Sequence, residues 1–166
     1  MKLSEWSALA EIVGAAGIIG SLVFVGTEIQ QNTSAIRTST VQAISDQATT
    51  ISLAFATDDR LADVLLEVAF QEIDDPNIEV SRADRFRLGQ AVRAQLRRVE
   101  NIFLHVEGGA LESSALDRVG YDWYTVPYIR SYWQAARPGF DAGFAKFMDG
   151  KIQESLARQE SDGAPE

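Results

Sequence analysis

The chain has 166 residues, enough to bury a core, and its hydrophobic and charged fractions of 46% and 23% exclude wholesale disorder. It contains no cysteine, which excludes disulfides, thiolate metal sites and cysteine nucleophiles. The formal net charge of −9 argues against a general nucleic-acid binder, because such a protein needs a basic surface.

The first predicted element contains an uncharged run over residues 12–27, bounded by Glu11 and Glu28. As a helix, these sixteen residues span roughly 24 Å, somewhat less than a hydrocarbon core of about 30 Å. The apolar residues lie on all sides of this helix instead of on one stripe, and Trp6 is placed like an interfacial anchor. The run therefore predicts a membrane helix over residues 6–28.

Two other interpretations of the run stay open. A core helix at the centre of a soluble bundle has a similar length and composition. A secretory signal fits poorly, because the residues before the run hold two glutamates and one lysine and no small-x-small cleavage site follows.

Small residues line one face of the same element. At 100° per residue, Ala10, Gly14, Gly17 and Ser21 share a side of the helix, which allows close approach of a second helix. This face predicts self-association through the N-terminal helix, so a homo-oligomer is expected. The glycines of "GAAGIIG" (14–20) lack the spacing and the preceding strand of a dinucleotide-binding loop.

The next stretch, up to residue 57, also has helical periodicity. Asn32, Thr33 and Ser34 offer side-chain oxygens that could cap a new helix. A single long helix that continues the first one is the alternative, and the sequence does not choose between them. The apolar stripe on this segment consists of Ile36, Thr40, Ile44, Ala48, Ile51 and Phe55.

Two oppositely charged segments follow. Residues 58–79 carry eight acidic residues and one basic residue, Arg60, whereas residues 82–107 carry six arginines and three acids. We expect the two segments to lie side by side and neutralise each other, with docking of Arg93 and Arg97 on the acidic segment. The alternative is a basic surface for phospholipid headgroups or an acidic partner.

Both segments contain a predicted helix. The first begins at Asp58 or Asp59, has Leu61, Leu65 and Val68 on its apolar face, and ends before Pro76. The second begins with a capping-box type of start at Ser81 and Asp84 and ends at Gly108-Gly109. Its apolar face consists of Leu88, Val92, Leu96, Val99, Phe103 and Val106.

Arg93, Arg97 and Glu100 on this second helix are the candidate site residues. Arg97 and Glu100 are three residues apart and can pair, and Arg93 stands one turn earlier. The functional interpretation is a site for an anionic ligand or headgroup, held by the two arginines and oriented by Glu100. The simpler interpretation, which we favour, is a solvated or interhelical charge cluster.

The C-terminal part is predicted to form short helices broken near Gly120 and Pro127, followed by an amphipathic helix over residues 139–157 and a flexible tail over 158–166. Six aromatic residues concentrate in this part, and core filling is their simplest role. They are Tyr121, Trp123, Tyr124, Tyr128, Tyr132 and Trp133.

No residue pattern indicates catalysis. His105 is the only histidine, so the usual zinc sets and the paired Glu-x-x-His motifs of di-iron bundles are absent. We expect His105 to be a structural or interfacial residue, and we expect no metal, no cofactor and no catalytic residue.

Three blocks of the chain resemble a group of uncharacterised bacterial proteins. These blocks are "SLVFVGTEIQQNTSAIR" (21–37), "RRVENIFLHVEGGAL" (97–111) and "SYWQAARPGFDAGFAKFMD" (131–149). Members of the group have a hydrophobic first helix, an E-I-x-x-N-T segment after it and a Trp-rich C-terminal part. Gln30 stands where this group would lead us to expect arginine. The resemblance implies a helical architecture and a bacterial membrane location, and it implies no activity.

Together these features predict an all-α protein with three parts: an N-terminal hydrophobic helix (1–30), a helical domain (31–157) and the tail. The function we expect is that of a non-enzymatic protein, anchored in the bacterial inner membrane, whose domain lies in the cytoplasm and binds a partner. Membrane lipid and a second copy of the chain are the expected partners, and nucleic acid is not. The alternative is a soluble cytoplasmic bundle that binds a ligand or regulates another protein, and an enzyme using carboxylates and arginines ranks third.

Overall fold

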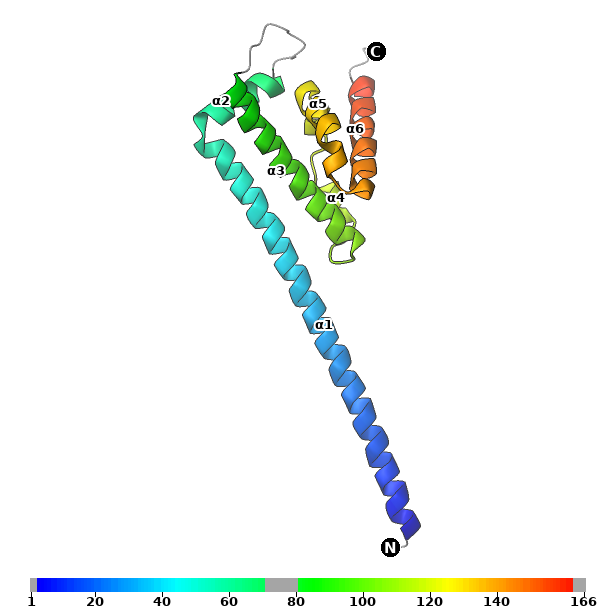
Figure 1. The fold of residues 1–166 in the computed structure, drawn as a ribbon. Coiled ribbons are helices and arrows are strands. Elements are labelled where there is room, and N and C mark those ends of the chain that lie inside the picture. The colour runs from blue at the N-terminus through cyan, green and yellow to red at the C-terminus, as the bar shows by residue number, and fades with distance from the viewer. Residues whose placement is uncertain (1–2, 71–80, 163–166) are drawn as a thin grey trace. The chain divides into compact units, whose positions relative to one another are not determined.

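The computed structural model describes residues 3–70 and 81–162, and within these ranges the chain is helical and contains no strand (Figure 1). The predicted all-α class, with a long N-terminal helix and a helical bundle after it, is confirmed. The α-helices are α1 (Leu3–Thr57), α2 (Asp59–Phe70), α3 (Arg82–Glu107), α4 (Ser114–Asp117), α5 (Pro127–Ala136) and α6 (Ala142–Asp162). Two short 3₁₀ helices, η1 (Asp122–Thr125) and η2 (Arg137–Gly139), flank α5.

Contacts between residues divide the chain into two units, residues 1–40 and residues 41–166. The sequence placed a boundary ten residues earlier, after residue 30. The second unit, called the domain below, comprises residues 41–57 of α1 and all later helices. Pro76, expected to end the helix before it, lies outside the described residues.

Helix α1 is continuous, which decides between the two interpretations of the segment before residue 57. The Thr33 hydroxyl does not cap a new helix, because it donates to the Ile29 carbonyl oxygen one turn earlier at 2.8 Å. No glycine or proline occurs between residues 28 and 57 to interrupt the hydrogen-bond ladder. Within the domain, the predicted stripe of Ile44, Ala48, Ile51 and Phe55 is partly buried, whereas Ile36 is exposed.

Helix α2 begins as expected. Asp58 caps it, since the Leu61 N–H donates to Asp58 Oδ1 at 3.0 Å. Leu61 is buried and Leu65 is half-buried, as expected for the predicted apolar face. Val64, which was not predicted to lie on this face, is also buried. This face packs against α3. The side chain of Val68 lies outside the described residues.

Helix α3 supplies the centre of the core. Its predicted face is confirmed, because Leu88, Val92, Leu96 and Val99 are fully buried. The Ser81 hydroxyl accepts a hydrogen bond from the Asp84 N–H at 3.1 Å and so caps the first turn. The helix ends at Gly108, and Gly109 has a φ of +73°, a conformation that costs glycine little.

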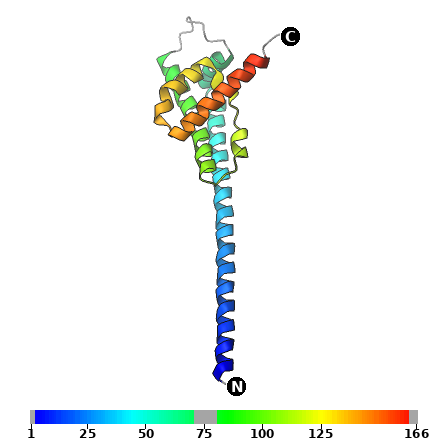
Figure 2. The ribbon, with the colours of Figure 1, turned by 90° about the vertical axis from the view of Figure 1, so that its right-hand side faces the viewer.

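The C-terminal helices complete the core with aromatic side chains, as predicted. Tyr121, Tyr124 and Trp133 are buried, and the Trp133 ring meets Phe144 edge-on at 5.9 Å between centroids. Burial raises the pKa of Tyr121 to about 12, and its hydroxyl donates to the Leu116 carbonyl oxygen. Figure 2 shows α6 running obliquely across the domain.

The predicted short helices with breaks near Gly120 and Pro127 are confirmed, since α4 ends at Asp117, η1 ends at Thr125 and Pro127 begins α5. One C-terminal expectation needs adjustment. Residues 158–162 were expected in a flexible tail but belong to α6, and Arg158 there donates to Asp122 Oδ1 and Ser155 Oγ. Residues 163–166 lie outside the described residues.

Candidate functional site

The N-terminal part of α1 presents a continuous apolar surface. Every residue from 10 to 29 is exposed, and the large apolar side chains among them range from 50% exposed at Val25 to 68% at Leu22. They are Ile12, Val13, Ile18, Ile19, Leu22, Val23, Phe24, Val25 and Ile29. This helix is long and apolar enough to span a membrane.

The helix satisfies its own backbone polar groups along this stretch. Its backbone N–H and C=O groups bond within the helix, as lipid requires. The Thr27 hydroxyl, at the end of the run, donates to the Phe24 carbonyl oxygen at 2.7 Å. The Thr27 hydroxyl therefore has a hydrogen-bond partner even where no water is present. The carboxylates of Glu11 and Glu28 lie outside the uncharged run.

The small-residue face on this run is open. Ala10 and Ser21 are exposed, and a Cβ placed on Gly14 or Gly17 would meet no heavy atom within 4 Å. Close packing within the described chain therefore does not require glycine at these two positions.

Arg97 and Glu100 connect α3 to the end of η2 and to Asp141, the residue before α6. Arg97 Nη1 donates to Glu100 Oε2 at 2.5 Å, and Arg97 Nη2 donates to the Gly139 carbonyl oxygen at 2.8 Å. The second carboxylate oxygen, Glu100 Oε1, accepts the Asp141 N–H at 2.8 Å. The Arg97 guanidinium also lies 4.2 Å from the centroid of the Phe140 ring.

The geometry of this cluster is that of an interhelical charge cluster. Glu100 is buried, and both of its oxygens have partners within the chain. Arg93, the third residue of the set, is exposed and makes no side-chain hydrogen bond or ion pair within residues 3–70 and 81–162. The structure thus joins Arg97 to Glu100 and leaves Arg93 apart from them. His105, near the end of α3, is also exposed.

The charged segments meet, but with different partners from those expected. Helix α2 packs on α3, yet the contact joins Arg60 of the acidic segment to Asp84 of the arginine-rich segment. The acidic segment thus contributes a cation to this contact, and the arginine-rich segment contributes a carboxylate. The expected docking of the arginine-rich helix is confirmed for residues 59–70, but Arg97 takes no part in it, because its described bonds are to Glu100 and Gly139. Residues 71–79 of the acidic segment lie outside the described residues.

Asp84 is the residue that sequence reasoning missed. Its side chain is 5% exposed. The carboxylate accepts two hydrogen bonds from Arg60, from Nε at 3.1 Å and from Nη2 at 2.6 Å. It also accepts hydrogen bonds from Arg87 Nη1 at 3.2 Å and from the Ser81 hydroxyl at 2.7 Å. Hydrogen bonds from Arg60 and Ser81 lower the pKa of the carboxyl to about 2, against the effect of burial. Its position three residues after Ser81 signalled a cap, not an interhelical ion pair.

Comparison with protein families, with curated proteins and with solved structures finds no match. The functional interpretation therefore depends on the chain's own surfaces.

No metal centre is apparent in the part of the chain that the structure describes, where no three His, Asp or Glu side chains gather. The feature that stands out there is the apolar surface of α1.

Proposed function

We propose that this is a single-pass membrane protein whose residues 6–28 cross the lipid and whose domain binds a partner without catalysing a reaction. In this proposal the membrane is the bacterial inner membrane and the domain lies on its cytoplasmic side. The observation that carries the proposal is the exposed, uncharged run over residues 12–27. A surface of this kind is costly in water and is the usual surface of a helix in lipid.

The length of the run is compatible with this location. About 24 Å of uncharged helix is roughly 6 Å shorter than an average hydrocarbon core. Local thinning of the bilayer accommodates such a mismatch at a fraction of a kcal/mol per Å. Trp6, which is exposed, is positioned five residues before Glu11 and suits the headgroup region.

An extraction experiment tests the membrane location. The full chain is expressed in a bacterium, and its membranes are washed with alkaline carbonate. The wild-type chain should stay in the pellet, whereas Ile18→Asp with Leu22→Asp should release it, because each aspartate near the centre of a membrane helix costs about 2.5–3.5 kcal/mol.

The matched control for this experiment places the same charges elsewhere on α1. Ile36→Asp with Leu53→Asp replaces two exposed apolar residues that lie outside the run, and this variant should stay in the pellet. A wild-type chain that is soluble without detergent would contradict the proposal and favour a core helix.

Cysteine labelling tests the side on which the domain lies. Lys2 and Arg37 are the nearest cations on the two sides of the run, one on each, so the positive-inside rule gives no preference. Because the chain has no cysteine, Lys2→Cys and Glu160→Cys each introduce a single reactive thiol. In intact spheroplasts, a membrane-impermeant maleimide should label position 2 and not position 160. The opposite pattern would place the domain outside the cytoplasm.

The partner-binding part of the proposal is supported by an apolar groove on the domain. Phe86 on α3 is 67% exposed and borders a groove of about 340 Å³ with Ile51, Phe55 and Leu61. A photoreactive phenylalanine analogue at position 86 should crosslink to one partner protein in cells. The same analogue at exposed position 154 on α6 is the control, and equal crosslinking at both positions would contradict a partner site at this groove.

A further inference from the structure

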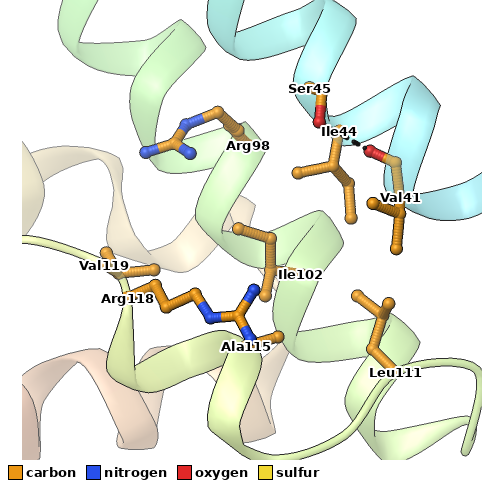
Figure 3. A pocket seen from close by; sticks show the side chains of 9 residues that line it. All are labelled: Val41, Ile44, Ser45, Arg98, Ile102, Leu111, Ala115, Arg118 and Val119. Carbon is orange, nitrogen blue, oxygen red and sulfur yellow. Dashed lines mark hydrogen bonds between the residues drawn. The ribbon is translucent and has the colours of Figure 1, made fainter.

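A second cavity in the domain is lined by two arginines and by apolar side chains (Figure 3). It lies among the residues of α1 just after position 40, the C-terminal half of α3, and the segment that contains α4. Its volume is about 180 Å³. The lining residues are Val41, Ile44, Ser45, Arg98, Ile102, Leu111, Ala115, Arg118 and Val119.

The apolar part of the lining sets the size of a possible ligand. Ile44, Ile102, Leu111 and Val119 present aliphatic side chains to the cavity, and Ile102 and Val119 are also part of the buried core. An apolar cavity of about 150 Å³ is large enough to hold benzene. The cavity here therefore suits a compact apolar body of about six to eight carbon atoms.

The polar part of the lining is cationic. Arg98 and Arg118 line the cavity, and no aspartate or glutamate does. Neither arginine forms an ion pair with any described residue, whereas Arg60, Arg97 and Arg137 each pair with a carboxylate. Two unpaired guanidinium groups beside an apolar lining favour an anion.

The two arginines differ in how the chain holds them. Arg98 Nε donates to Gln95 Oε1 at 3.1 Å, which holds the side chain along α3 while its terminal nitrogens have no acceptor among the described residues. The Arg118 guanidinium extends toward Ile102 in the view of Figure 3. A carboxylate can accept two N–H bonds from one guanidinium, which orients the ligand as well as attracting it.

We propose that this cavity binds a small organic carboxylate with an aryl or branched apolar body of about six to eight carbons. The carboxylate meets Arg98 and Arg118, and the body lies against Ile44, Ile102 and Leu111. This inference goes beyond the proposed membrane function and does not depend on it, because every lining residue belongs to the domain.

Fluorine NMR of 4-fluorophenylacetate measures binding to the full chain in nanodiscs of phosphatidylcholine, a lipid without net charge. We expect a Kd of about 0.1–1 mM, since a ligand of about eleven heavy atoms gains a few tenths of a kcal/mol per atom. The neutral analogue 2-(4-fluorophenyl)ethanol should bind at least about tenfold more weakly, because it lacks a charge-assisted bond. Equal affinity for the acid and the alcohol would overturn the proposal.

Substitutions locate the binding. Arg98→Gln and Arg118→Gln should each weaken binding at least about tenfold. Ala115→Leu fills the cavity and should abolish binding. Thermal unfolding of each variant is the folding control, and an unchanged profile shows that the loss of binding is local to the cavity. Arg93→Gln, at an exposed arginine of the same helix that does not line the cavity, is the matched control and should bind normally. Normal binding by all three cavity variants, or equal loss in the control, would overturn the assignment.

Two competition arms separate the proposed ligand from other anions. Inorganic phosphate at tenfold excess over the probe should not displace it, because phosphate has no apolar body. Nanodiscs that contain phosphatidylglycerol should leave the affinity of the probe unchanged. Displacement by phosphate would make the cavity a bare anion site, and displacement by phosphatidylglycerol would make it a headgroup site. Either result would overturn the proposal of a small carboxylate.

Discussion

Asp84 joins two helices through a single carboxylate. Both oxygens are used, since Oδ1 accepts from Arg60 and Arg87 and Oδ2 accepts from Arg60 and Ser81. Charge-assisted bonds of this kind are stronger than neutral ones and are costly to lose when the remaining partners stay in place. The contact of α2 with α3 therefore depends on Asp84 as well as on apolar packing by Val64.

Asp84→Asn should lower the melting temperature of the full chain by several degrees at pH 7, because an amide does not attract Arg60 as a carboxylate does. The folded pKa is about 2 and the ordinary value is 3.8, so the carboxylate stabilises the folded state above about pH 4. That contribution is lost as the pH falls toward 2. The difference between wild type and variant should therefore shrink between pH 4 and pH 2.

Near-UV circular dichroism of the full chain in detergent, recorded during heating at several pH values, measures this difference. A difference in melting temperature that stays constant from pH 7 to pH 2 would show that Asp84 does not act through its charge.

Arg97 and Arg93 lie one turn apart on α3 and differ in their contacts, so substituting each one compares a bonded arginine with an exposed one. Arg97→Met should destabilise the domain by about 1–2 kcal/mol, because Glu100 remains buried with one of its partners removed. Arg93→Met should change stability by less than about 0.5 kcal/mol, because Arg93 is exposed. Denaturant unfolding of both variants measures the two effects. Equal destabilisation would mean that the bonds of Arg97 to Glu100 and Gly139 do not stabilise the domain.

At the scale of the element, α1 combines two kinds of helix in one. Residues 10–29 are exposed on all sides, whereas residues 41–57 have a partly buried stripe at Ile44, Ala48 and Ile51. The first pattern suits lipid, and the second suits a helix at the side of a soluble core. The small-residue face belongs to the first part, so we expect any self-association of α1 to occur there.

Gly17→Leu with Ser21→Leu should reduce dimer formation in membranes, since close packing between helices in lipid requires small residues at the contact. Disulfide crosslinking through Ala10→Cys measures the dimer without background, because the chain has no cysteine. The substitution at Gly17 has room, with no heavy atom within 4 Å of a new Cβ.

Gly26→Leu, on nearly the opposite side of the helix, is the control for this experiment, and its Cβ also has room. Equal crosslinking in the double variant and the wild type would mean that two copies do not meet through this face.

In the molecule as a whole, the domain contains the buried apolar core that the described residues form. Every buried residue of the core cluster, from Val64 to Ile152, lies within residues 41–166. A chain that consists of residues 41–166 should therefore be soluble and helical, and it should unfold cooperatively with a free energy of about 5 kcal/mol or more.

Circular dichroism and denaturant unfolding of this fragment test the prediction. If the fragment aggregates or unfolds while the full chain is soluble without detergent, the run over residues 12–27 is needed for the core, and the proposed membrane anchor is wrong.

Part of the site was predictable and part was not. The exposed run on α1 follows from composition, because a stretch apolar on all sides has no face to turn to water. The pairing of Arg97 with Glu100 follows from their spacing of three residues on a helix. The bond from Arg97 to Gly139 could not be predicted, because it depends on where the end of η2 lies relative to α3.

The all-α class, the start of α3 at Ser81, its end at Gly108 and the aromatic filling of the core could all be predicted from the sequence. These features depend on periodicity and on capping groups within a few residues of each other, so local physics suffices. The pairing of Arg60 with Asp84, 24 residues away, and the presence of Arg98 and Arg118 in the lining of one cavity depend on tertiary packing. A count of charges does not say which cation meets which carboxylate, because the packing of helices distant in sequence sets those distances.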